Sequence, residues 1–157
     1  MRILLSSSLA IAGMMSLPAA VSPLQTENRP APDLRNDPRV HTLRSFFSAS
    51  DCPASNYSEH FVGAADHYDL DWRLLPSISY VESTGGKRAP HNNMFGWDSG
   101  RAKFTSPAAG IYAVGYRLSR SKLYRGKDLD DLLATYNPNA EYAQRVKFVM
   151  RQISRGE

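Results

Sequence analysis

The chain has 157 residues and a formal net charge of +4, from 19 basic and 15 acidic side chains. The basic residues are scattered along the chain rather than gathered in one stripe, which argues against a nucleic-acid-binding protein. The single cysteine, Cys52, excludes an intramolecular disulfide, and the length suits one domain better than two.

The N-terminal residues have the pattern of a secretory signal peptide. Met1 and Arg2 precede an apolar, serine-containing stretch that ends in Pro18-Ala19-Ala20. A stretch of about 15 residues is too short to span a bilayer comfortably, and small residues suit a cleavage site. No later run is long and apolar enough to span a membrane. We therefore expect a signal peptide over 1–20 and a secreted or periplasmic protein with no membrane span.

A proline-rich segment follows. Residues 21–38 hold four prolines among polar side chains and have almost nothing apolar to bury. This composition predicts a linker, with a single domain over 39–157.

The first part of that domain has helical spacing of apolar residues. A short helix is expected over 40–47, and a second over 57–68, where apolar residues recur on one helix face. Asp71 can cap a third helix, from Trp72 to Glu82, through its side-chain oxygen.

A long loop comes next. Residues 83–105 contain four glycines, two adjacent asparagines and no helical period. A loop of this length inside a compact domain is usually functional. We expect it to be irregular or to hold a short hairpin around Phe95 to Phe104.

Capping residues and prolines predict the ends of three further helices. Ser106-Pro107 pairs a capping hydroxyl with proline at the first helical position, and the helix should run to Arg120. Asp128 opens a short helix that Asn137-Pro138 ends, because the residue before a proline disfavours helical geometry. Asn139 can cap a last helix. The sequence therefore predicts a mainly α single domain of about five helices with one long inserted loop.

Glu82 is the candidate with the clearest chemistry. It ends an apolar helical run, with Ile78 and Val81 on the preceding turn. Desolvation and the negative end of the helix dipole both favour its protonated form, so its pKa should be raised. A protonated carboxyl can act as a general acid.

Three segments of unusual composition occur in a suggestive order: Tyr80-Val81-Glu82-Ser83, His91-Asn92-Asn93-Met94-Phe95-Gly96-Trp97 and Thr135-Tyr136-Asn137-Pro138. Together they resemble the lysozyme-like helical domains that cleave peptidoglycan, which include soluble lytic transglycosylases and bacterial endo-N-acetylglucosaminidases. The loop is closer to the Asn-Asn-x-Phe-Gly form of the glucosaminidases. Pro138, and the absence of a Gly-Leu-Met-Gln loop, depart from the transglycosylases.

The resemblance implies a lysozyme-like fold over roughly 57–153 and a set of site residues. Glu82 would be the catalytic acid, and Tyr136 would hydrogen-bond Glu82 or the substrate, although it could equally be a core residue. The expected substrate-binding residues are Ser83, Asn92, Asn93, Phe95, Gly96, Trp97 and Asn137. Phe95 and Trp97 would stack on sugar rings, and Phe95 could also belong to the core. We expect no cofactor, no metal and a monomeric protein.

Cleavage of a β-glycosidic bond requires a proton donor and a group that stabilises the oxocarbenium-like centre. Asp71 lies about 16 Å from Glu82 along a helix, too far for this role. Asp98 is the only acid in the loop, and a structural turn role suits it better. Without a second carboxylate, the 2-acetamido group of the substrate can stabilise the cation.

The expected function is therefore cleavage of the β-1,4 bond between N-acetylmuramic acid and N-acetylglucosamine in peptidoglycan strands, as in a lytic transglycosylase. Two alternatives stay open. One is hydrolysis by an endo-N-acetylglucosaminidase, and the other is a non-catalytic peptidoglycan-binding or secretion-associated module.

Overall fold

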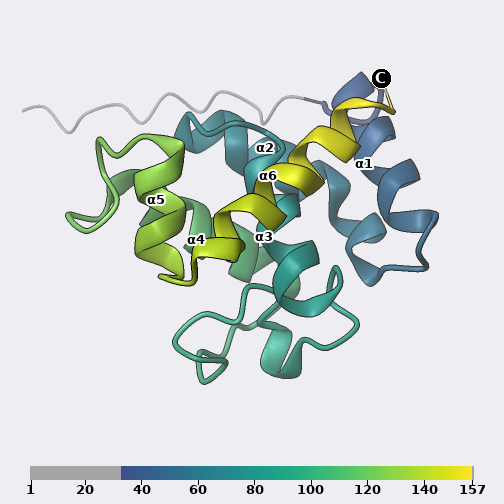
Figure 1. Cartoon of the computed structure of the whole chain (residues 1–157). Coiled ribbons are helices and arrows are strands. Elements are labelled where there is room, and N and C mark those ends of the chain that lie inside the picture. Colours follow the sequence, from purple (N-terminus) through teal and green to yellow (C-terminus); the bar gives the residue numbers. More distant parts are fainter. Residues whose placement is uncertain (1–32, 157) are drawn as a thin grey trace, which may run out of the picture. The chain divides into compact units, whose positions relative to one another are not determined.

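The computed structural model describes residues 33–156, which form six α-helices and two short 3₁₀ helices joined by loops (Figure 1). The α-helices are α1 (Pro38–Ser48), α2 (Ser58–Tyr68), α3 (Leu74–Ser83), α4 (Pro107–Arg120), α5 (Leu129–Tyr136) and α6 (Ala140–Ser154); the 3₁₀ helices span Pro53–Tyr57 and Pro90–Asn92. These residues belong to one compact unit, and none of their helices is long and apolar enough to cross a membrane. The expected signal peptide, 1–20, lies outside the described residues.

No strand occurs between residues 33 and 156, so the hairpin considered around Phe95 to Phe104 is absent. The reason is local backbone geometry. Gly96, Asp98, Ser99 and Gly100 all have positive φ, between 54° and 80°. Left-handed residues in such close succession produce consecutive turns rather than the extended conformation of a strand.

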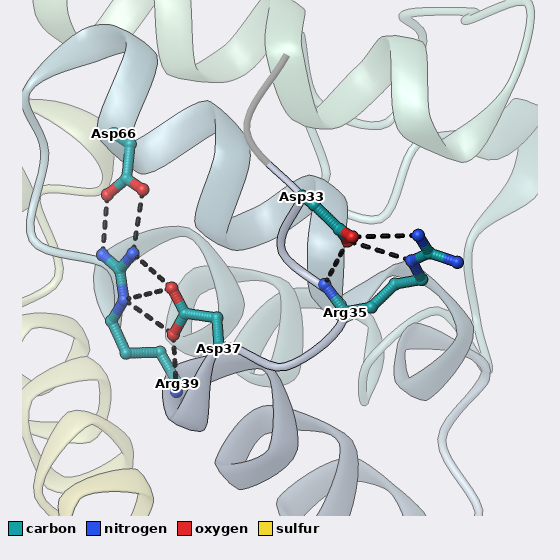
Figure 2. Close-up of polar contacts among 5 residues, drawn as sticks. All are labelled: Asp33, Arg35, Asp37, Arg39 and Asp66. Carbon is teal, nitrogen blue, oxygen red and sulfur yellow. Dashed lines mark hydrogen bonds and ion pairs between the residues drawn. The ribbon is translucent and has the colours of Figure 1, made fainter. Parts of the chain in front are cut away.

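The domain begins slightly earlier than composition indicated, because residues 33–38 lie on it. Asp37 accepts a hydrogen bond from the Arg39 backbone N–H and caps α1. The Arg39 guanidinium pairs with Asp37 and, 2.6 Å away, with Asp66 on α2 (Figure 2). Leu34 packs against the core. Residues 21–32, the rest of the expected linker, lie outside the described residues.

The three expected caps of the later helices are confirmed. The Ser106 hydroxyl accepts from the Ala109 N–H, Asp128 from Asp131, and Asn139 from Glu141. In each pair the capping oxygen and the helix N–H are close in sequence, which is why the signal can be read locally.

The start of the third helix was predicted wrongly. α3 begins at Leu74 rather than Trp72, and no side chain caps it. Asp71 instead accepts from the Arg73 backbone N–H at 2.9 Å and pairs with the Arg73 guanidinium. The carboxylate is thus held by a charged neighbour in a tight turn before the helix.

Helix α3 is largely buried and contributes several residues to the hydrophobic core. Leu75 and Ile78 are fully buried and Leu74 nearly so. α3 packs on α6, while α2 packs on α4 and α1. In Figure 1 the yellow helix α6 passes over teal α3. The end of α3 therefore lies at a fixed place beside α6 and the long loop.

Candidate active site

Glu82 lies on the last turn of α3 and is partly buried. Thr84 ends the helix in the left-handed conformation with φ of 54°. The next residue, Gly85, has φ of 58°, and a Cβ there would lie 2.8 Å from the Cys52 Cβ. The chain just after α3 is thus packed closely against the segment that follows α1.

Ser83 fastens the long loop to the helix end. Its buried hydroxyl donates to the Met94 carbonyl at 2.8 Å, with the Ser79 carbonyl at 3.1 Å as a second acceptor. It also accepts from the Gly86 N–H at 3.0 Å. All hydrogen bonds of this hydroxyl are made within the protein. We therefore assign Ser83 a role in positioning the loop instead of the expected direct contact with substrate.

The loop brings Gly96 onto the Glu82 carboxyl. Gly96 has φ of 58°, and a Cβ at this position would lie 2.7 Å from Glu82 Oε2. Real Cβ atoms do not approach other atoms this closely, so any other residue would displace the carboxyl. The aliphatic and carboxyl parts of Glu82 are therefore covered on one side by glycine backbone.

Burial raises the pKa of Glu82, the direction expected from the sequence. Two groups on α6 oppose this rise: the Tyr142 hydroxyl, by hydrogen bonding, and the nearby charge of Arg145. The Tyr142 hydroxyl oxygen is buried and makes no hydrogen bond of normal geometry within residues 33–156, so its interaction with Glu82 is a weak one. The groups that shift the pKa of Glu82 include no second carboxylate.

Asn93 and Asn92 hold the shape of the loop. The Asn93 carbonyl oxygen accepts from the Trp97 N–H and its amide donates to the Trp97 carbonyl, both at 3.0 Å. Asn92 donates to the Phe104 carbonyl at 2.9 Å. Asn93 is 2% exposed, so its expected contact with substrate is replaced by a role in orienting Trp97.

Phe95 lies in the core. Its side chain is fully buried and packs edge-on against Phe61. Stacking of Phe95 on a sugar is incompatible with that burial. The backbone carbonyl of Phe95 instead accepts a 2.5 Å hydrogen bond from the Tyr136 hydroxyl. Burial raises the pKa of Tyr136 well above its usual value, so the hydroxyl keeps its proton as a donor.

Trp97 forms the wall of a cleft of about 410 Å³. Its ring meets Tyr136 edge-on with centroids 5.6 Å apart and lies 6.2 Å from Tyr124. The Arg117 guanidinium lies over the same ring, 5.2 Å from its centroid. These residues and Gly96 line the cleft, which joins aromatic surface to one cation.

A second, more open groove of about 690 Å³ lies between α3 and α6. It is lined by Val81, Arg145 and Phe148 among others, and Phe148 is 54% exposed. Gly96, which touches the Glu82 carboxyl, lines the first cleft, and Arg145, which acts on its charge, lines the second. Glu82 itself lines neither hollow, but one of its neighbours lines each of them.

The remaining candidates have local roles. The Asn137 side chain accepts from the Asn139 N–H at 3.0 Å and orders the turn before α6. Asp98 pairs with Arg101 at 2.8 Å on the surface of the cleft. Among residues 33–156, no group of His, Cys, Asp and Glu side chains could hold a metal ion.

Sequence reasoning missed Tyr142, Arg145, Tyr124 and Arg117. The Tyr142 ring stacks on Tyr136 with centroids 5.8 Å apart, and its hydroxyl faces Glu82. No local signal could have identified it, because the contact joins residues sixty positions apart.

Comparisons with protein-family models, with curated proteins and with solved structures found no match for this chain.

Proposed function

We propose that this protein cleaves the glycan strands of peptidoglycan, at the β-1,4 bond between N-acetylmuramic acid and N-acetylglucosamine, with Glu82 as the single general acid and base. The observation that carries the proposal is the Glu82 carboxyl, partly buried with a raised pKa and held against Gly96, a residue that lines the Trp97 cleft. The helical fold and the motif resemblance support a lysozyme-like domain.

Glu82 would first act as an acid. A carboxyl with a raised pKa retains its proton at pH values where an exposed glutamate has lost it. It donates that proton to the glycosidic oxygen as the bond to the anomeric carbon breaks. The carboxylate left behind is stabilised by the Tyr142 hydroxyl and by the charge of Arg145, the two groups that lower its pKa.

The second role would fall to the substrate. Within residues 33–156, no carboxylate is among the groups that shift the pKa of Glu82, which favours attack on the anomeric carbon by the substrate's own acetamido carbonyl oxygen in place of a protein nucleophile. Glu82 then takes the proton of the 6-hydroxyl of the same N-acetylmuramic acid residue, whose oxygen bonds to the anomeric carbon and displaces the acetamido oxygen, which closes the 1,6-anhydro ring. If water gives up the proton instead, the product is that of hydrolysis.

The aromatic cleft would hold the sugars. Trp97, which is partly exposed, offers apolar ring surface to a pyranose face, while the buried Tyr124 packs beside it and Asn93 fixes the orientation of Trp97. A strand that crosses Glu82 would fill the Trp97 cleft on one side and the α3–α6 groove on the other. Export directed by residues 1–20 would bring the enzyme to this substrate, where it would act as a monomer.

The test is digestion of purified peptidoglycan by the wild type and by Glu82→Gln, followed by mass spectrometry of the released fragments. We expect the wild type to release muropeptides lighter by one water at the muramic-acid end, and Glu82→Gln to lose at least a thousandfold in rate. Reducing N-acetylglucosamine ends would indicate the hydrolytic glucosaminidase. Binding without any cleavage would indicate the non-catalytic module and overturn the proposal.

A further inference from the structure

Two charged side chains, Arg117 and Asp98, line the Trp97 cleft. Within residues 33–156, Arg117 is the one of the two that has no ion-pair partner. It lies on the last turn of α4, is exposed, and holds its guanidinium 5.2 Å from the Trp97 ring centroid. It makes no ion pair with any carboxylate between residues 33 and 156. The other charged residue of the cleft, Asp98, is bound by Arg101.

Arg117 is distinguished by the Trp97 ring that holds it rather than by its lack of an ion pair, which within residues 33–156 it shares with Arg88, Arg120, Arg125, Arg145, Arg151 and Arg155. Five other arginines each pair with an aspartate or glutamate: Arg35, Arg39, Arg44, Arg73 and Arg101. Arg117 instead stacks on an aromatic ring, which holds a guanidinium in place without cancelling its charge. The cleft therefore presents a positioned and uncompensated cation to whatever occupies it.

Resting on the function proposed above, we infer that Arg117 binds a carboxylate of the glycan in the Trp97 cleft and selects carboxylate-bearing strands over neutral N-acetylglucosamine polymers. A guanidinium can donate two parallel N–H bonds to a carboxylate, which gives direction as well as attraction. Peptidoglycan offers such a group in two forms. Peptide-free muramic acid has a free lactyl carboxylate, whereas peptide-bearing muramic acid has its carboxylates on the stem peptide.

The experiment measures binding by calorimetry in the Glu82→Gln background, so that no strand is cleaved during titration. The ligands are peptide-free glycan strands, the same strands with the lactyl carboxylates converted to methylamides, peptide-bearing strands, and chitin hexaose. The variants are Arg117→Gln, Arg117→Lys and, as a matched control, Arg120→Gln, an exposed arginine of the same helix outside the cleft.

Arg117→Gln should weaken binding of carboxylate-bearing strands roughly five- to tenfold, a modest loss because the cation is exposed. Binding of chitin hexaose and of the methylamide strands should change by less than about twofold. Arg117→Lys should retain part of the preference, and Arg120→Gln all of it. A loss confined to peptide-free strands identifies the lactyl carboxylate, and a loss confined to peptide-bearing strands identifies the stem peptide.

Two results overturn the inference while leaving the proposed function intact. One is an equal loss on charged and neutral ligands, which would mean that Arg117 only supports Trp97. The other is no loss on any ligand. If the parent Glu82→Gln protein binds none of the four ligands and the wild type cleaves no peptidoglycan, the proposed function itself is wrong.

Discussion

The backbone of Gly96 lies against the carboxyl group of Glu82, so closely that a Cβ on Gly96 would lie 2.7 Å from Glu82 Oε2. This contact joins the end of α3 to a loop residue fourteen positions later. It buries one side of the carboxyl without giving it a charged partner, and burial is the main cause of its raised pKa.

Gly96→Ala should therefore reduce activity sharply. The added methyl group must displace the carboxyl, and misplacement of a proton donor by about 1 Å costs roughly 10- to 100-fold in kcat/KM. The matched control is Gly100→Ala, which has φ of 80° but nothing within 4 Å of its added Cβ. Both variants should lose about 1 kcal/mol of stability from left-handed backbone strain. Equal activity in the two would contradict the importance of the contact.

Glu82→Gln should be more stable than the wild type at neutral pH. The folded pKa of Glu82 lies above its unfolded value, so the folded state binds more protons and loses stability as pH rises from the unfolded pKa through the folded one. Removing the carboxyl removes this loss, so the variant should gain stability at neutral pH, by a small amount because the carboxyl is only partly buried. Thermal unfolding at pH 7 and pH 4 measures the effect, which should shrink at the lower pH. A gain of the same size at both pH values would contradict it.

Tyr142→Phe should shift the pH profile of kcat/KM. The Tyr142 hydroxyl lowers the pKa of Glu82, so its removal raises that pKa and moves the alkaline fall in activity to higher pH. The variant should keep its stability, because the hydroxyl makes no complete hydrogen bond that could be lost. Tyr112→Phe, whose ring lies on α4 beside His60 and Tyr68, serves as the control and should leave the profile unchanged. A shift toward lower pH would contradict the assignment of Tyr142.

Asn93→Ala should loosen the aromatic cleft. The substitution removes both hydrogen bonds to the Trp97 backbone and leaves buried polar groups without partners, which costs about 1–3 kcal/mol. Chemical denaturation measures the loss of stability, and quenching of tryptophan fluorescence should show greater access to Trp97. Asn56→Ala, at an exposed asparagine of the first 3₁₀ helix, is the control. Unchanged stability and quenching in Asn93→Ala would show that the loop is held by other contacts.

Helix boundaries that depend on one local interaction could be read from the sequence. Ser106, Asp128 and Asn139 cap helices through N–H groups within three residues, and all three were predicted. Asp71 was predicted wrongly because a competing partner, Arg73, takes its carboxylate. The absence of a hairpin depends on the positive φ of Asp98 and Ser99, which their residue types permit but do not require.

In the candidate site, too, local features could be predicted from the sequence and tertiary ones could not. The three segments that resemble peptidoglycan-cleaving domains could be recognised because each is continuous in the sequence. The sequence did not show which of their residues are buried. Phe95 and Asn93 carry the motif and yet lie inside the protein, where they support the loop. Periodicity cannot distinguish a loop side chain that points into a core from one that points into a cleft.

The sequence alone determined the helical class, most helix ends and the apolar run that leads to Glu82, because these follow from periodicity and from contacts between near neighbours. Only the tertiary structure decided what surrounds that carboxyl. Gly96, Tyr142 and Arg145 reach Glu82 from a loop and from α6, and Arg117 reaches Trp97 from α4. Such contacts depend on how helices pack across the whole domain, and no local pattern encodes them.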